Sequence, residues 1–140
     1  MGRGADKERP ARPPGGVLIA EADPALGDLY RSTLEADDWQ VEVVASSASV
    51  MERVHRAPPA VLLLSTMQDA NQLSVVEQVR SVAGGEDLII IVLVDTLDGL
   101  DTRQLSSLKV QAWLSKTRTT RDKLSQTIAK LVQSASQAHP

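Results

Sequence analysis

The sequence predicts an α/β fold, a doubly wound three-layer sandwich with a parallel sheet between two layers of helices. Its strand candidates are short and continuously apolar, which is typical of strands buried on both faces of a parallel sheet. Segments with apolar residues at helical spacing separate them, as βα units require. The 140 residues contain no cysteine and are enough for one core, so we expect a single domain without disulfides.

The strand candidates divide the chain into five βα units. The third contains only Val and Leu, and the fourth is the most apolar, so we expect it near the centre of the sheet. Right-handed crossovers between parallel strands then favour the flavodoxin-like strand order 2-1-3-4-5. The five expected strands are Val17–Ala20, 41–44, Val61–Leu64, 88–94 and 112–114.

Each helix candidate has a start or stop signal. The first begins after Asp23, a typical N-cap that is followed by proline. Ser49 and Thr119 each precede an acidic residue by three positions, which predicts capping boxes for the second and fifth helices. A third helix is expected over about 71–82, before a pair of glycines, and a weaker fourth helix over 100–108.

The two ends of the chain differ in composition from the rest. Residues 1–16 are rich in Gly, Pro and charge, so they predict a disordered basic tail before a domain at 17–133 and a second tail at 134–140. Beyond residue 16 the chain has 11 basic and 16 acidic residues, which disfavours nucleic-acid binding. The longest apolar run is too short to cross a bilayer, and we expect a cytoplasmic protein without membrane insertion.

Three segments resemble the receiver domains of response regulators, the CheY-like family. They are VLIAEADPAL at 17–26, PAVLLLS at 59–65 and VQAWLSK at 110–116. The resemblance spans nearly the whole expected domain. It implies an acidic Mg²⁺-binding pair after the first strand, a phospho-accepting aspartate after the third, a hydroxyl after the fourth and a lysine after the fifth.

Most of these positions are changed in this chain. The acidic pair falls on Glu21 and Ala22, and the acceptor falls on Ser65, which cannot form an acyl phosphate. The hydroxyl position falls on Val94 or Asp95, whereas the lysine is present as Lys116.

The resemblance therefore implies a degenerate pseudo-receiver. We expect a signalling module of two-component type that acts by phosphorylation-independent protein–protein contact, without enzymatic activity or a cofactor. Its partner would be a signalling protein in trans or a second copy in a homodimer. In the family, the surface made by the fourth helix, fifth strand and fifth helix docks partners. Here it includes residues 100–109, Trp113 and residues 119–130, and the expected contact residues are Leu105, Leu108, Trp113 and Thr117.

Two alternatives remain open. An active receiver would accept phosphate on a displaced carboxylate, for which Asp23, Asp69 and Asp95 are the candidates. A flavodoxin-like cofactor-binding protein would need phosphate-binding loops, and the turn after the first strand lacks the glycines for one. No metal is expected, apart from the alternative of a cation held by Glu21 and Asp95.

Overall fold

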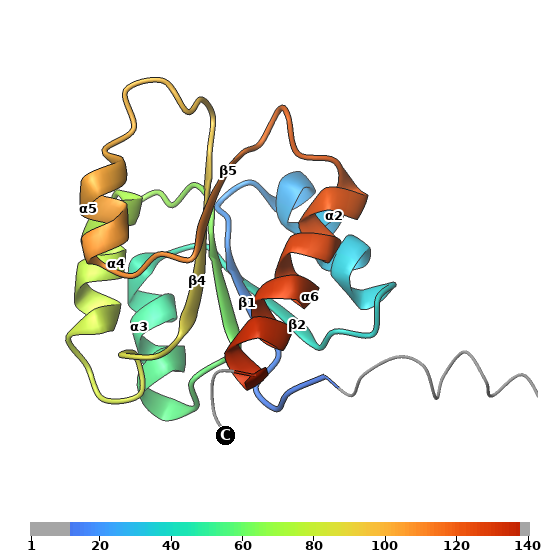
Figure 1. The fold of residues 1–140 in the computed structure, drawn as a ribbon, viewed down its shortest axis with the longest axis horizontal. Coiled ribbons are helices and arrows are strands. Elements are labelled where there is room, and N and C mark those ends of the chain that lie inside the picture. The colour runs from blue at the N-terminus through green and yellow to red at the C-terminus, as the bar shows by residue number, and fades with distance from the viewer. Residues whose placement is uncertain (1–11, 138–140) are drawn as a thin grey trace, which may run out of the picture.

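The computed structural model describes residues 12–137 as a five-stranded parallel sheet with helices on both faces (Figure 1). The sheet order is β2-β1-β3-β4-β5, which confirms the predicted order 2-1-3-4-5. Neighbouring strands pair in register, with Ala20 opposite Leu64 and Val94 opposite Ser115. The strands are β1 (Val17–Ala20), β2 (Val41–Val44), β3 (Val61–Leu64), β4 (Ile89–Val94) and β5 (Ala112–Ser115).

The helices form one layer on each side of the sheet. In Figure 1, α2 and α6 lie on one side, and α3, α4 and α5 lie on the other. Among the described residues, no helix combines the length and hydropathy needed to span a bilayer. The helices are α2 (Pro24–Glu35), α3 (Ser47–Arg56), α4 (Gln72–Arg80), α5 (Thr102–Ser107) and α6 (Arg121–Gln137).

Two apolar cores explain why the strands are continuously apolar. In β1, Leu18 and Ala20 join the core beneath α3, α4 and α5, whereas Val17 and Ile19 join the core beneath α2 and α6. Successive side chains of a strand point to opposite faces, so a strand covered on both sides needs an apolar residue at every position.

Of the three N-cap residues predicted from the sequence, the structure confirms one and contradicts two. Asp23 is the N-cap of α2, as predicted, and its Oδ1 accepts a hydrogen bond from the Ala25 amide at 2.9 Å. The predicted cap at Ser49 is wrong, because Ser46 caps α3 and accepts from the Ser49 amide at 3.2 Å. The predicted cap at Thr119 is wrong by one residue, because Thr120 Oγ1 accepts from the Lys123 amide.

The described residues include segments on both sides of the expected domain at 17–133 that pack or continue a helix. Arg12 donates to the carbonyl oxygen of Asp37 and lies 4.4 Å from the ring centre of Trp39. Gly16, at φ 65°, accepts from the amides at the start of β3 and lies so close to Gln40 that a Cβ would overlap it. Helix α6 continues to Gln137, past the expected boundary. Residues 1–11 and 138–140 lie outside the described residues.

Arg80 fastens the end of α4 to the start of β4. Its guanidinium donates to five backbone carbonyl oxygens, at 2.8–3.1 Å, from the turn after α4 and from the end of α5. These carbonyls lie outside the helix and sheet ladders, and a buried carbonyl without a donor is costly. One side chain therefore completes the backbone hydrogen bonding of three segments; the acceptors are Gly85, Glu86, Leu88, Leu108 and Lys109.

We predict that Arg80→Ala lowers the free energy of unfolding by about 2–4 kcal/mol, because several partly buried carbonyls lose a charged donor. Urea denaturation followed by circular dichroism measures the change. Arg103→Ala is the matched control, since Arg103 is exposed on α5 and makes no side-chain hydrogen bond or ion pair with any described residue. Equal effects of the two substitutions would contradict this role of Arg80.

Candidate functional site

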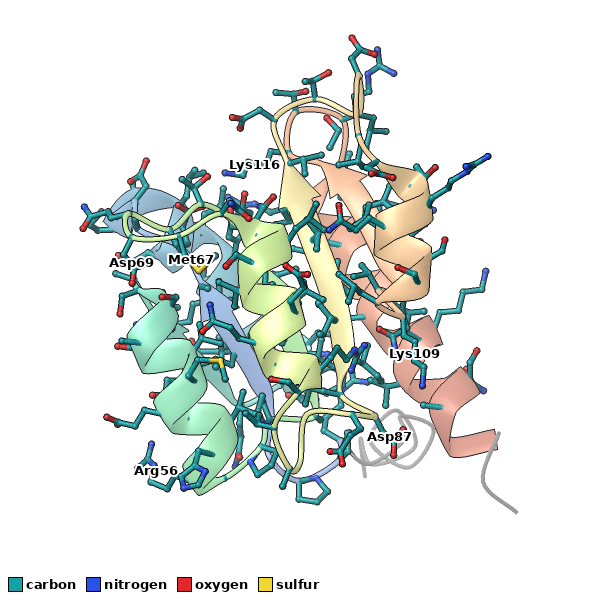
Figure 2. The ribbon with its side chains drawn as sticks, turned by 90° about the vertical axis from the view of Figure 1, so that its left-hand side faces the viewer. Arg56, Met67, Asp69, Asp87, Lys109 and Lys116 are labelled. Atoms are coloured by element: carbon teal, nitrogen blue, oxygen red, sulfur yellow. The ribbon has the colours of Figure 1, made fainter. Side chains whose placement is uncertain are left out.

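Polar side chains collect at the edge of the sheet where the strands end. In Figure 2, Lys116, Met67 and Asp69 lie at this end of the molecule, whereas Arg56 and Asp87 lie at the opposite end. In open α/β sheets this edge is where ligands bind and chemistry occurs. The register predicts which residues meet there, because the residue after each strand continues the pairing of its last residue.

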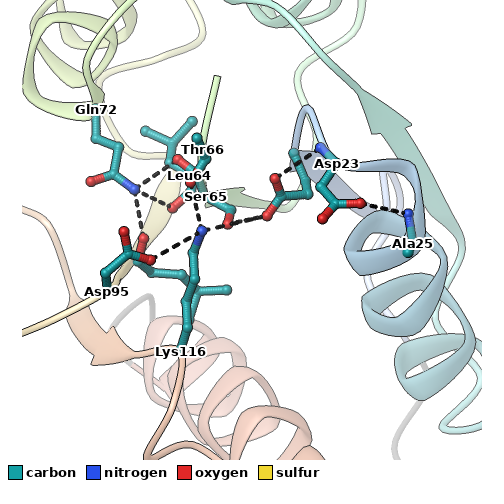
Figure 3. A network of polar contacts seen from close by, with 10 residues as sticks. Asp23, Ala25, Leu64, Ser65, Thr66, Gln72, Asp95 and Lys116 are labelled. Atoms are coloured by element: carbon teal, nitrogen blue, oxygen red, sulfur yellow. Dashed lines mark hydrogen bonds and ion pairs between the residues drawn. The ribbon is translucent and has the colours of Figure 1, made fainter. Parts of the chain in front are cut away.

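Glu21 and Ser65 are neighbours because β1 and β3 pair in register up to Ala20 and Leu64. The Ser65 hydroxyl, which is fully buried, donates to Glu21 Oε1 at 2.5 Å. The Asp23 amide donates to the other oxygen, Oε2, at 3.1 Å. Ser65 therefore acts as a hydrogen-bond donor to a buried carboxylate, and a dashed line marks this contact in Figure 3.

Lys116 supplies the positive charge of this cluster. Its Nζ donates to the Thr66 hydroxyl at 2.6 Å and forms ion pairs with Glu21 at 3.6 Å and Asp95 at 3.8 Å (Figure 3). The lysine side chain is 13 % exposed and that of Glu21 is 1 % exposed, whereas that of Asp95 is 89 % exposed. The ion pair with Glu21 is thus buried away from water. The ion pair with Asp95 is exposed, so solvent weakens its attraction.

The sequence did not single out Thr66 or Gln72 as members of the site. Gln72 Nε2 lies 2.6 Å from the Leu93 carbonyl oxygen and 2.7 Å from that of Ser65, so it ties the ends of β3 and β4 together. Thr66 directly follows Ser65 at the end of β3, and Lys116 directly follows β5. Both residues therefore lie at the same edge of the sheet, and the sequence could have predicted their contact. No sequence pattern near Gln72 indicates its hydrogen bonds to the strand ends, because these bonds depend on where α4 starts.

Tyr30, on α2, lies close enough to this cluster to be affected by its charges. Burial raises the pKa of its phenol, and the nearby negative charge of Glu21 raises it further, while the Ser65 hydroxyl acts in the opposite direction. The phenol therefore remains protonated over the whole physiological range. It adds a neutral hydroxyl group to the α2 side of the cluster.

The residues present do not fit a magnesium ion. Mg²⁺ requires oxygen ligands in near-octahedral geometry. Ala22 offers no side-chain oxygen, Ser65 uses its proton on Glu21, and Lys116 contacts both Glu21 and Asp95. The ammonium thus pairs with both carboxylates of the alternative cation site. Within residues 12–137, no group of three or more acidic or histidine side chains is arranged to hold a metal.

The three displaced carboxylates have different surroundings. Asp23 caps α2. Asp69 accepts hydrogen bonds from the amide and hydroxyl of Ser47 at the start of α3, and these bonds lower its pKa. Asp95 is exposed beside Lys116, and Val94 ends β4 without offering a hydroxyl. Two of the three carboxylates therefore accept hydrogen bonds from backbone amides at the start of a helix.

The expected interaction face is present only in part. Leu105 is fully buried in the core, so it cannot contact a partner in this structure and its assignment to the face is corrected. Leu108 and Trp113 pack against the same core and are partly exposed, and Thr117 is exposed. Leu97, in the loop leading to α5, is 44 % exposed, which is unusual for a large apolar side chain in the described chain.

Comparisons with solved structures place this fold among receiver domains. No family model and no curated protein matches the sequence. A sensor protein from Polaromonas has a TM-score of 0.76 at 23 % identity, with 88 % of this chain and 99 % of that chain covered. A CheY-like receiver domain protein from Methanospirillum hungatei has a TM-score of 0.79 at 15 % identity, with 87 % and 96 % covered.

A third similar structure holds the metal that the site of this chain does not fit. The receiver domain of a sensor histidine kinase from Pseudomonas aeruginosa, with a magnesium ion in its active-site cleft, has a TM-score of 0.76 at 17 % identity. The match covers 85 % of this chain and 98 % of that one. The chain thus has the fold of CheY-like receiver domains, with a different set of side chains at the strand ends.

We predict that Tyr30 titrates above its ordinary pKa of 10.0 in the folded protein, because burial and Glu21 both favour the neutral phenol. A raised folded-state pKa means that this stabilisation is present below pH 10 and is lost as the pH rises through the folded pKa. Tyr30 is the single tyrosine of the chain, so tyrosinate absorbance reports it alone.

Glu21→Gln is expected to lower the Tyr30 titration midpoint, because it removes the nearby charge. Glu35→Gln, at an exposed position at the end of α2, is expected to leave it unchanged. A wild-type midpoint at or below 10.0 would contradict the assignment.

Proposed function

We propose that this protein is a receiver-like signalling module of two-component type that acts by protein–protein contact without aspartyl phosphorylation. The observation that carries the proposal is the bond from the buried Ser65 hydroxyl to Glu21, together with the ion pair from Lys116. The acceptor position therefore holds a hydrogen-bond donor that is already committed to a carboxylate.

The chemistry of phosphoryl transfer supports this reading. An acceptor must present a nucleophilic oxygen to the phosphoryl group, and positive charge must neutralise the transferred phosphate. Ser65 is fully buried and its proton points to Glu21, with no histidine in the cluster to act as a base. Lys116 is neutralised by Glu21, so its charge is not free for a phosphate.

The displaced-carboxylate alternative is less well supported. Asp23 and Asp69 accept hydrogen bonds at helix starts, and turning toward an incoming phosphate would leave those amides unpaired. Asp95 is exposed beside Lys116, and no group of three or more acidic or histidine side chains among the described residues could hold a metal there.

This arrangement supports signalling by contact with a separate protein molecule. A receiver changes conformation when phosphate favours one of two states. Here the network around Glu21 is complete without phosphate, which favours a single state. The partner surface that we propose consists of Leu108, Trp113 and Thr117, with Leu97 in the adjoining loop leading to α5. The partner is a signalling protein or a second copy of this chain.

We predict that incubation with acetyl phosphate and Mg²⁺ adds no phosphoryl group, because no described carboxylate combines access with a metal site. Intact-mass spectrometry measures the outcome, with an authentic receiver domain that retains its aspartate as the positive control. A hydroxylamine-labile gain of one phosphoryl group would overturn the proposal. Asp23→Asn, Asp69→Asn and Asp95→Asn would then identify the acceptor.

We predict that Trp113→Ala weakens partner binding about tenfold or more, because buried aromatic anchors dominate most interfaces. Binding proteins are first identified by capture from the native cell, and affinity is then measured with the purified partner. Self-association is followed by analytical ultracentrifugation of the protein alone.

Two further variants make this test specific. Leu97→Ser removes an exposed side chain at no cost to the core, so a loss of affinity there is independent of folding. Glu35→Gln on α2, across the sheet from α5, is the control and should bind as the wild type does. Wild-type affinity in both Trp113→Ala and Leu97→Ser would exclude this surface.

A further inference from the structure

The loop between β5 and α6 concentrates positive charge in an acidic domain. Residues 116–123 contain four basic side chains and one acidic side chain, whereas the chain as a whole has a net charge of −3. Lys116 is committed to Glu21 and Thr66. Within the described part of the chain, the side chains of Arg118, Arg121 and Lys123 make no ion pair or hydrogen bond. Three cations are therefore available to an external anion.

A cavity of about 340 Å³ lies between α2 and the start of α6, beside these charges. Its apolar wall consists of Leu26, Leu29 and the buried Leu124. Ligand cavities in proteins have volumes of roughly 300–1,000 Å³, with mostly apolar walls and a few polar groups that fix orientation. This cavity agrees with that description in both size and lining.

The polar lining favours a single negative charge. Arg121 and the hydroxyls of Thr117 and Thr119 line the cavity at the α6 side, and Thr119 makes no side-chain hydrogen bond with a described residue. The first turn of α6, a helix of 17 residues, adds the partial positive charge of its N-terminus. Asp95 and its ion-pair partner Lys116 also line the cavity and offset each other's charge, so Arg121 supplies the one unpaired charge of the described lining.

We propose that this cavity binds a small amphipathic monoanion. Its apolar body packs against Leu26, Leu29 and Leu124, and its carboxylate or equivalent group pairs with Arg121 and accepts from the threonine hydroxyls. An inorganic anion would leave the leucine wall uncovered. A long acidic peptide would need an extended surface, whereas the apolar lining here is confined to one cavity.

The cavity and the proposed partner surface share one residue, Thr117. The cavity lies on the α2 and α6 side of the sheet, whereas Leu97 and Leu108 belong to the loop before α5 and to its C-terminal end, on the other side. Ligand binding is measured on the protein alone, so failure of either proposal leaves the other unaffected.

The test is a titration of the ¹⁵N-labelled full chain with octanoate, followed by two-dimensional NMR. We expect saturable shifts confined to amides of residues 26–33 and 117–124. Octanol, which lacks the charge, and octylammonium, which inverts it, are expected to bind at least about tenfold more weakly. Equal affinity for octanoate and octylammonium, shifts spread over other surfaces, or no saturation would overturn the proposal.

Two matched variants test the assigned contact. Arg121→Gln is expected to weaken octanoate binding about five- to tenfold, because it removes a charged donor from the cavity. Lys123→Gln removes an equally unpaired charge two residues later that does not line the cavity, so affinity should change less than about twofold. Equal losses would indicate general electrostatic attraction and overturn the site. Tighter binding of a polyglutamate peptide than of octanoate would overturn the small-molecule assignment.

Discussion

The burial of one carboxylate organises the edge of the sheet where the strands end. A carboxylate withdrawn from water is costly unless donors and a countercharge replace its hydration. At Glu21 these come from three segments: the Asp23 amide after β1, the Ser65 hydroxyl after β3 and the Lys116 ammonium after β5. Satisfying one side chain therefore fixes the relative positions of three strand ends. An incoming phosphoryl group would have to break this arrangement, whereas a docking partner would leave it intact.

Helix α4 is also held in place by polar side chains that donate hydrogen bonds to other segments. Its first residue, Gln72, donates to carbonyls at the ends of β3 and β4, and its last residue, Arg80, donates to carbonyls at the start of β4 and the end of α5. Both ends of the helix are thus tied to the sheet by side chains that complete backbone hydrogen bonding. The apolar face between them only has to fill space, which short aliphatic residues such as Val75, Val76 and Val79 do.

The sheet was predictable from sequence because its signal is repeated and local. Continuous apolar runs specify buried parallel strands, and the strand order follows from crossover handedness. The residues next to strand ends, Glu21, Ser65 and Lys116, were predictable for the same reason. Caps at Ser46 and Thr120 were missed because nearby Ser and Thr residues offer equal local signals. Leu105 was misassigned because its side of α5 depends on tertiary packing, and Gln72 was missed because its acceptors lie on two other segments.

Helix α5 has six residues and a single buried side chain, Leu105. Few apolar contacts therefore oppose its detachment from the sheet, and the exposed loop before it adds little. Regions of this kind open at a lower free energy than the rest of a domain. A partner that covers Leu108 and Trp113 would suppress such opening, so part of its binding free energy would be spent on ordering α5. Occupancy of this surface would then be observed as increased rigidity of α5.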